Sequence, residues 1–341
     1  MKKLLSMAMA GCMLFGLLAG CGGGTQAQDA APAGNGDKAA AQDGAADDGH
    51  KLKIGLSISA RDQWVSNMEQ AAIDKAGELG VDFSSFDANT DPITQISHVQ
   101  TCAADGYDAM VVHIVNTDNA QEILDAAGDM KVVFVNRVVD ENLFKEGQVV
   151  YVGSNEEEAG GYQGEYIAKK LKDEGKTEAN VAIMTGTLGM QAMVLRTDSA
   201  KKALEGSGLA VNYVFEDTGE WDRAKAMDKF TQFLGSGKPV DAVICNNDEM
   251  ALGVIEAMKT SGEKKVVCPV AGIDATSVAL ESIVSGDMAF TVFQNAVGQG
   301  GGAVEAAVKL AKGEPCELYT WIPFEPVDKD NVNDYIGANK N

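Results

Sequence analysis

The sequence has few of the residues on which catalysis and nucleic-acid binding usually depend. It holds only three histidines, of which His50 lies in a polar segment and His98 and His113 fall in an expected helix and strand. No GxSxG, HExxH or P-loop motif is present, and no GxGxxG follows the first expected strand. Acidic residues outnumber basic ones by 50 to 28, and the net charge of −22 repels nucleic acid and anionic lipid headgroups. We therefore expect neither an enzyme nor a nucleic-acid-binding protein.

Cysteines are also sparse and give no metal-binding or redox pattern. Beyond Cys12 and Cys21 near the N-terminus there are four, widely spaced and without a CxxC pair: Cys102, Cys245, Cys268 and Cys316. A zinc ribbon or a thioredoxin-type site is therefore not expected. The sequence leaves open whether any of these four form disulfides. We expect no metal and no cofactor.

Long hydrophobic runs are missing except at the N-terminus. Lys2 and Lys3 precede the apolar run 4–18, which has the length of a signal peptide and is short for a membrane-spanning helix. The run ends in Leu-Ala-Gly-Cys at 18–21, which resembles the lipobox of bacterial lipoproteins. The resemblance implies a signal peptide over 1–20 and a lipid anchor on Cys21. The alternative is an ordinary signal peptide with an incidental cysteine.

After the N-terminal run the composition changes twice. Residues 21–50 are mostly Gly, Ala, Gln and Asp, which cannot bury enough apolar surface to fold, so this segment is expected to be a disordered tether. From residue 51 onward, short apolar runs alternate with amphipathic stretches in two rounds of similar length. This alternation predicts an α/β fold of two doubly wound parallel-sheet lobes.

The expected elements follow from hydrophobic periodicity and from helix-start signals such as Asp91-Pro92. Strands are expected at 53–58, 81–86, 109–114, 132–135, 149–152, 180–185, 210–216, 242–245, 266–272 and 289–294. Helices are expected at 63–79, 93–104, 119–127, 156–172, 190–204, 223–234, 250–261, 277–285 and 298–312.

Several short motifs in this order resemble one family. They are Ile54-Gly55-Leu56, Val135-Asn136-Arg137, YVGSN at 151–155, GGYQG at 160–164, Glu220-Trp221-Asp222, NNDEMALG at 246–253, Gly272-Ile273-Asp274 and TVFQ at 291–294. Together they make residues 51–341 similar to the type I periplasmic sugar-binding proteins of ABC transporters, the ribose and galactose/glucose group. The resemblance implies a periplasmic binding protein-like fold whose lobes are joined by a three-crossing hinge. One lobe is then 51–154 plus 295–318, and the other is 155–294 plus 319–341.

The resemblance implies that a monosaccharide binds between the lobes, at positions that follow expected strands. Aromatic faces would come from Trp64 and Trp221. The expected hydrogen-bonding residues are Asp62, Asn136, Arg137, Arg196, Asn247, Asp274 and Gln294. A planar guanidinium suits this task because it bonds two hydroxyls at fixed geometry.

Each assignment has a structural alternative. Asn247 and Asp274 could simply cap the helices that follow them, and the two tryptophans could be ordinary half-buried aromatics. Met190 and Ala192 occupy positions where the family has polar groups, which leaves the exact sugar open. Gln191 could substitute for them, and Arg61 is a further candidate donor.

The function that follows is an extracytoplasmic lipoprotein that captures a hexose such as galactose or glucose, or a similar polyol, and delivers it to an ABC permease. We expect a monomer anchored to the cell membrane. The alternative is a receptor that presents the same sugar to a sensor kinase or chemoreceptor. A transcription regulator with this two-lobed body would carry a DNA-binding helix-turn-helix where this sequence has a signal and a tether. The segment 172–178 is too short for the calcium loop of the galactose/glucose branch.

Overall fold

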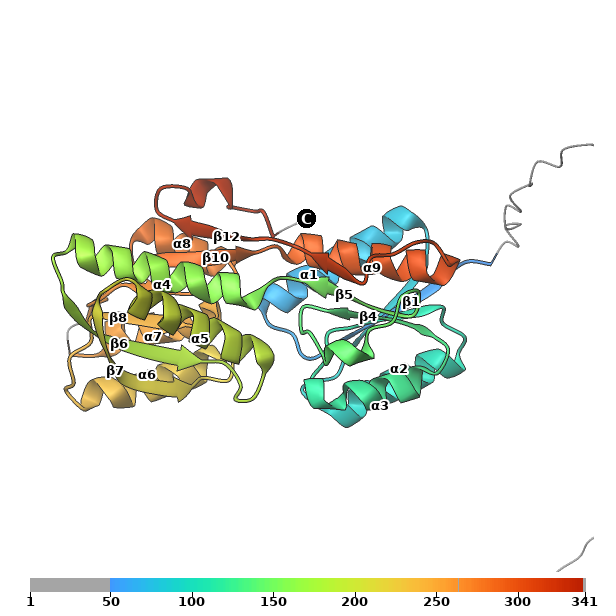
Figure 1. The fold of residues 1–341 in the computed structure, drawn as a ribbon, viewed down its shortest axis with the longest axis horizontal. Coiled ribbons are helices and arrows are strands. Elements are labelled where there is room, and N and C mark those ends of the chain that lie inside the picture. Colours follow the sequence, from blue (N-terminus) through green and yellow to red (C-terminus); the bar gives the residue numbers. More distant parts are fainter. Residues whose placement is uncertain (1–49, 263, 340–341) are drawn as a thin grey trace, which may run out of the picture. The chain divides into compact units, whose positions relative to one another are not determined.

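A computed structural model describes residues 50–262 and 264–339, and these form two β-sheets of mainly parallel strands, each with helices on both faces (Figure 1). The predicted signal peptide, the tether and Cys21 lie outside the described residues. Within the described part of the chain, no helix is long and apolar enough to cross a membrane.

The first sheet has the strand order β11-β5-β4-β3-β1-β2, and all its pairs are parallel. Its strands are β1 (Lys53–Ile58), β2 (Asp82–Asp87), β3 (Ala109–Val112), β4 (Lys131–Val135), β5 (Val149–Gly153) and β11 (Tyr319–Trp321). One face packs against α1 (Gln63–Leu79) and α9 (Ala296–Lys312), and the other against α2 (Pro92–Ala104) and α3 (Ala120–Ala127). Short 3-10 helices lie at η1 (Thr117–Asn119) and η2 (Glu141–Leu143).

The second sheet has the order β12-β10-β9-β8-β6-β7, and only the β10–β12 pair is antiparallel. Its strands are β6 (Glu178–Thr185), β7 (Ala210–Thr218), β8 (Ala242–Cys245), β9 (Val270–Ala271), β10 (Phe290–Gln294) and β12 (Phe324–Asp328). One face packs against α4 (Glu156–Asp173) and α5 (Gln191–Gly206). The other packs against α6 (Arg223–Gly235), α7 (Asp248–Thr260) and α8 (Ser277–Ser285), with η3 (Val332–Asp334) beyond β12.

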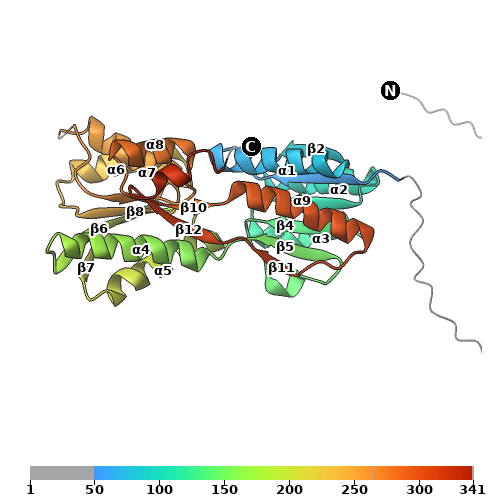
Figure 2. The ribbon, with the colours of Figure 1, turned by 90° about the horizontal axis from the view of Figure 1, so that it is seen from above.

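The chain passes between the two sheets three times. It leaves the first sheet after β5, returns after β10 and leaves again after β11, as the C-terminal segment in Figure 2 shows. The two α/β lobes of the predicted fold class are therefore confirmed. The lobe boundaries stay a prediction, with one correction: 319–321 were expected in the second lobe, but β11 pairs with β5 of the first sheet.

The predicted elements agree with the structure except at three places. The strand expected at 266–272 is reduced to β9, because Pro269 has no N–H for a ladder bond and only its carbonyl accepts, from Val243 N. The strands β11 and β12 were not predicted. Both are short edge strands, and β12 contains Pro326, which is tolerated only at a sheet edge.

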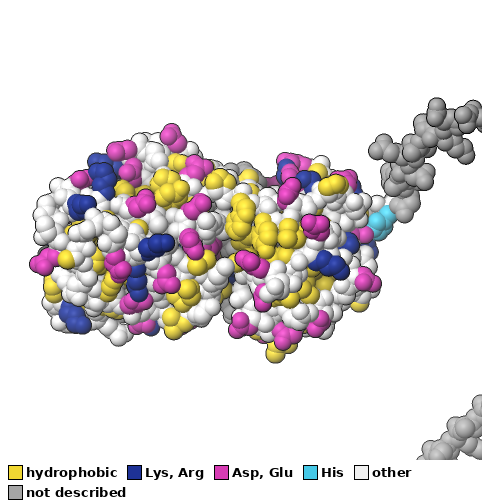
Figure 3. All heavy atoms as spheres, in the orientation of Figure 1, with side chains coloured by type: hydrophobic (Ala, Val, Ile, Leu, Met, Phe, Trp, Pro, Cys, Tyr) yellow, Lys and Arg dark blue, Asp and Glu magenta, His cyan; other side chains and the backbone are white. Residues whose placement is uncertain are grey.

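Charged side chains are distributed over the surface without a dominant basic patch on the visible face. Figure 3 shows Asp and Glu spread over both lobes, with Lys and Arg between them.

Candidate functional site

One cavity between the two lobes is lined by thirteen residues. The residues come from loops and helix starts that follow the carboxyl ends of β1, β3, β4, β6, β7, β8, β9 and β10. Ligands bind at this edge in open α/β sheets. The cavity measures about 70 Å³ and adjoins a more open one of about 670 Å³, with which it shares Asp62, Val65, Arg137, Met190 and Trp221.

All nine predicted binding residues line this cavity: Asp62, Trp64, Asn136, Arg137, Arg196, Trp221, Asn247, Asp274 and Gln294. The remaining lining residues are Val65, His113, Met190 and Ala192. That the nine contact a ligand stays a prediction. Arg61 and Gln191 do not line the cavity; Arg61 lies at its outer opening and bonds Glu69 and Asp87 instead.

Asp62 and Trp64 enter the cavity from the start of α1. Asp62 caps this helix, and its Oδ1 accepts a hydrogen bond of 2.7 Å from Val65 N. Asp62 remains accessible to solvent in the cleft, and partial desolvation by the surrounding protein atoms raises the pKa of its carboxylate against the opposing effect of that bond and of Arg137. Trp64 is 4% exposed and its Nε1 donates to Gln294 O at 2.9 Å, which ties the first lobe to the second.

His113, Asn136 and Arg137 follow β3 and β4. Asn136 adopts a left-handed conformation (φ 66°), which Asn tolerates better than most residues, and its Oδ1 accepts from His113 Nε2 at 3.3 Å. The Arg137 guanidinium donates to Ile114 O at 2.7 Å, and burial lowers its pKa to about 10. Burial, aided by the Arg137 charge, holds the pKa of His113 well below its usual value. His113 is thus a neutral hydrogen-bonding group in the wall.

Trp221 and Asn247 form part of the wall in the second lobe. The backbone of Trp221 has a φ of 65°, which is rare for an aromatic residue. Its ring lies directly over Gly186, where an added Cβ would be 2.1 Å from the ring. Asn247 caps α7, with Oδ1 accepting from Met250 N at 3.0 Å. The capping alternative is therefore correct for Asn247, although its side chain also lines the cavity.

Asp274 and Gln294 are the least satisfied polar groups of the site. Asp274 is 6% exposed, and none of the described residues donates a hydrogen bond to its carboxylate. It does not cap α8, because Thr276 does. Burial, with a contribution from the charge of Asp248, raises the pKa of Asp274 well above its usual value. Gln294 is 2% exposed, and its Nε2 finds no partner among the described residues.

Arg196 is held by a residue that the sequence did not single out. Its Nε donates to Glu156 Oε2 at 2.5 Å, its Nη1 to Asn246 O at 2.8 Å and its Nη2 to Gln294 Oε1 at 3.4 Å. Glu156 is the first of three consecutive glutamates at the start of α4, and nothing in that run shows which of them is buried. His113 was expected inside the strand at 109–114; the structure ends β3 at Val112, so that His113 directly follows the strand and faces the cavity.

The described residues contain no group of three or more His, Cys, Asp or Glu side chains that could hold a metal ion. The four cysteines of the folded part are free thiols in this structure. The chemistry of the cavity is therefore that of hydrogen bonding by carboxylates, amides and guanidiniums beside two indole rings.

The sequence model of the periplasmic binding protein domain matches residues 54–315. The chain belongs to the periplasmic binding protein family. The family sequence likeness and the two parallel-sheet lobes identify a binding protein of type I fold, and the family places such proteins outside the cytoplasm.

Two similar proteins are each named as binding a particular ligand. The chain is 37% identical over 85% of its length to a Rhizobium meliloti protein named "Putative rhizopine-binding protein", of which it covers 94%. It is 31% identical over 83% of its length to the D-galactose/methyl-galactoside binding periplasmic protein MglB of Haemophilus influenzae, of which it covers 92%. Because the relatives are binding proteins, the expectation that this chain is not an enzyme is confirmed.

A solved structure of similar sequence has the same fold. The ABC transporter solute-binding protein of Bacillus halodurans C-125, solved with bound myo-inositol, is 36% identical, with a TM-score of 0.78. The match covers 86% of this chain and 99% of that one.

Proposed function

We propose that this periplasmic binding protein captures a monosaccharide-sized cyclic polyol between its lobes and delivers it to an ABC permease. The observation that carries the proposal is the pair of unsatisfied groups in the cavity wall. Asp274 offers a carboxylate that accepts no hydrogen bond from the described residues, and Gln294 offers a buried N–H group with no acceptor among them. A hydroxyl group both donates and accepts, so a ligand with several hydroxyls satisfies both residues.

The rest of the wall supports the same ligand class. The C–H face of a saturated ring can pack on the indoles of Trp64 and Trp221, while amides and carboxylates bond its hydroxyls. A site of this kind rejects analogues that lack a hydroxyl, because its own buried groups then stay unpaired. Relatives named for rhizopine and galactose and a related structure holding myo-inositol make myo-inositol and hexoses such as galactose the first compounds to test.

A ligand panel tests the proposal. Inositols, hexoses and pentoses are screened by thermal shift and then by calorimetry, because a ligand that binds only the folded state raises the melting temperature. We expect at least one cyclic polyol to bind and to change tryptophan fluorescence. If no polyol in the panel binds, the proposed ligand class is wrong.

Two tryptophan variants give a matched comparison. Trp221→Ala removes an indole from the cavity wall, whereas Trp321→Ala removes an indole that is 56% exposed on β11 and does not line the cavity. We expect Trp221→Ala to weaken binding by about tenfold or more, from the loss of buried aromatic contact, and Trp321→Ala to leave it nearly unchanged. Equal affinities in both variants would argue against the indole contact.

Delivery to a permease is the finer part of the proposal. It is supported by the similar solute-binding protein from Bacillus halodurans, which is described as part of an ABC transporter. In membranes that contain the cognate permease, the ligand-bound protein should stimulate ATP hydrolysis more than the empty protein. A response from a sensor kinase instead would favour the receptor alternative.

We also propose that Cys21 carries the lipid anchor. Support comes from the Leu-Ala-Gly-Cys sequence at 18–21, which lies outside the described residues. Wild-type protein should partition into the detergent phase of a Triton X-114 extract, and Cys21→Ser should partition into the aqueous phase. Equal partitioning of the two would reject the anchor.

A further inference from the structure

Arg196 contacts a residue next to each of the three crossings between the lobes. At the first crossing it bonds Glu156, which begins α4, and at the second it bonds Gln294, which ends β10. At the third, its guanidinium carbon lies 5.9 Å from the ring centroid of Phe324, which begins β12. The same guanidinium lines the cavity and lies 5.7 Å from the ring centroid of Trp221. One side chain thus connects the ligand site with all three hinge segments.

Glu156 is the charged partner that holds Arg196 in this position. Both side chains are almost completely buried, with exposed fractions of 4% for Glu156 and 5% for Arg196. Glu156 does not line the cavity, and its second oxygen, Oε1, is buried with no hydrogen-bond partner among the described residues. Burying a carboxylate that lacks a hydrogen bond on one oxygen costs folding free energy, and the charge of a buried partner is what offsets this cost. Its first-turn position in α4 also places it at the favourable end of the helix dipole.

The need for a carboxylate follows from the charges around the cavity. Arg137 and Arg196 line the same small space, and the charge of Arg196 contributes to the lowered pKa of Arg137. Glu156 offsets the charge of Arg196, and its attraction helps to raise the Arg196 pKa. The backbones of α4 and α5 are in close contact at the same point, since an added Cβ on Gly160 of α4 would lie 2.1 Å from Arg196 O.

We propose that Glu156 is a positioning residue for ligand binding: it orients the Arg196 guanidinium toward the cavity and couples ligand contact there to the hinge. This inference rests on the proposed function only in requiring that a polyol binds in the cavity. Because Glu156 does not line the cavity, we expect its effect on affinity to pass through Arg196.

A double-mutant cycle tests the inference. Glu156→Gln and Arg196→Lys are made singly and together, and calorimetry measures the affinity for the tightest-binding polyol of the panel. Glu157→Gln, an exposed neighbour in the same turn of α4, is the control. We expect Glu156→Gln to weaken binding about tenfold in the wild-type background, within the range of coupling between contacting residues. With Lys at 196 the same change should alter affinity by less than about twofold, and Glu157→Gln should have no effect.

Two results would overturn the inference: wild-type affinity in Glu156→Gln, or the same loss in both backgrounds, which would mean that Glu156 acts independently of Arg196. Solution scattering adds a readout of hinge coupling, since Glu156→Gln at saturating ligand should compact less than wild type, and full compaction would contradict the coupling. If Glu156→Gln does not fold, Glu156→Asp takes its place in the cycle, because it keeps the charge but has a shorter side chain. The same two results would then overturn the inference. If wild type binds no polyol, the proposed function itself fails, which is a different result.

Discussion

At the scale of single residues, several cavity side chains also serve the backbone. Asp62 and Asn247 each use one oxygen to cap a helix, with bonds to Val65 N and Met250 N. A cap restricts the rotamer of the side chain, so the atoms left for a ligand are fixed before it arrives. The capping and binding interpretations of such residues are therefore compatible, and a sequence pattern that predicts one does not exclude the other.

Asp248 lies next to this site but serves the core of the second lobe. Its Oδ1 accepts from Thr291 Oγ1 at 2.7 Å and its Oδ2 from Thr276 N at 2.9 Å, and it is fully buried. Burial raises its pKa from 3.8 to about 7, although these hydrogen bonds oppose the shift. A carboxyl group whose pKa is higher in the folded state contributes stability that is present below the unfolded pKa and is lost as the pH rises through the folded pKa.

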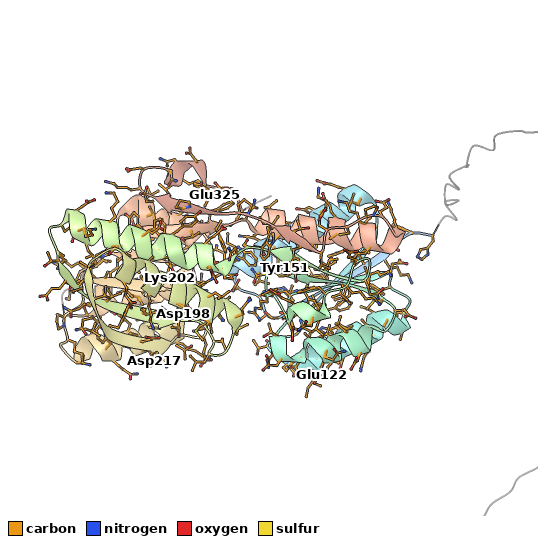
Figure 4. All side chains as sticks on the ribbon, viewed as in Figure 1. Glu122, Tyr151, Asp198, Lys202, Asp217 and Glu325 are labelled. Atoms are coloured by element: carbon orange, nitrogen blue, oxygen red, sulfur yellow. The ribbon has the colours of Figure 1, made fainter. Side chains whose placement is uncertain are left out.

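We therefore predict that Asp248→Asn flattens the pH dependence of stability between about pH 4 and pH 7. Its amide can accept from Thr276 N and donate to Thr291, so the hydrogen bonds are retained without the titrating group. Denaturant unfolding at pH 4.5 and pH 7.5 should show the variant gaining relative to wild type at the higher pH. Asp198→Asn, on the exposed face of α5 (Figure 4), is the control and should keep the wild-type pH dependence. An unchanged dependence in Asp248→Asn would contradict the assignment.

At the scale of elements, the close packing of α4 on α5 positions Arg196. Two glycines of α4 make this approach possible: an added Cβ would lie 2.1 Å from Arg196 O at Gly160 and 2.4 Å from Ala200 O at Gly164. Both neighbours are backbone atoms, which cannot move aside without shifting the helix. The GGYQG sequence at 160–164 is thus explained by helix packing rather than by ligand contact.

The two adjacent glycines of α4 give a sharp prediction. Gly160→Ala should destabilise the protein by about 1–3 kcal/mol through overpacking and should also weaken ligand binding, since it displaces the turn that carries Arg196. Gly161→Ala meets nothing within 4 Å and should stabilise by about 0.5–1 kcal/mol, the usual gain of Ala over Gly in a helix. Urea unfolding of both variants measures the difference. The prediction fails if the two variants have equal stability.

At the scale of the whole folded body, contacts between the lobes surround the cavity. Gln63 Nε2 donates to Ser277 Oγ at 2.8 Å, and Trp64 Nε1 donates to Gln294 O at 2.9 Å. Within the first sheet, Tyr151 on β5 (Figure 4) packs edge-on against Trp321 on β11, with 5.6 Å between the ring centroids, so this contact joins the strands that lead into the first and third crossings. A hinge of this kind concentrates its backbone changes in a few residues at the crossings.

We predict that ligand binding closes the lobes. Hydrogen-bonding groups stand on both sides of the cavity, with Asp62 and Asn136 on one lobe and Asn247 and Asp274 on the other. A ligand shifts the open–closed equilibrium only by its differential affinity for the two states, and contacts completed on closing supply that difference. The radius of gyration from solution scattering should fall at saturating ligand. An unchanged radius despite confirmed binding would reject the closing mechanism.

Asp274→Ala separates the closing mechanism from simple binding. It should fold, lower affinity by about 1–3 kcal/mol through the loss of a buried hydrogen-bonding group, and reduce compaction at matched ligand occupancy. A variant that loses affinity yet closes fully would place Asp274 outside the closing mechanism.

The sequence alone determined most of the architecture of this protein. The alternation of apolar runs and amphipathic stretches fixed nearly every strand and helix, because strands buried on both faces and helices buried on one leave different periodicities. The rule that ligands bind at the carboxyl ends of parallel strands then indicated where the site lies. The choice of particular residues, such as Asn136 and Asp274, depended on the resemblance to a family.

Tertiary structure decided what depends on contacts between distant segments. Only the fold shows that β11 extends the first sheet by pairing with β5, that Thr276 rather than Asp274 caps α8, and that Glu156 is buried beneath Arg196. Short edge strands and buried ion pairs leave no periodic signal, because their stability comes from partners far away in the sequence. The cavity-lining positions could therefore be predicted from the sequence with the help of the family resemblance, whereas the groups that hold these side chains in place could not.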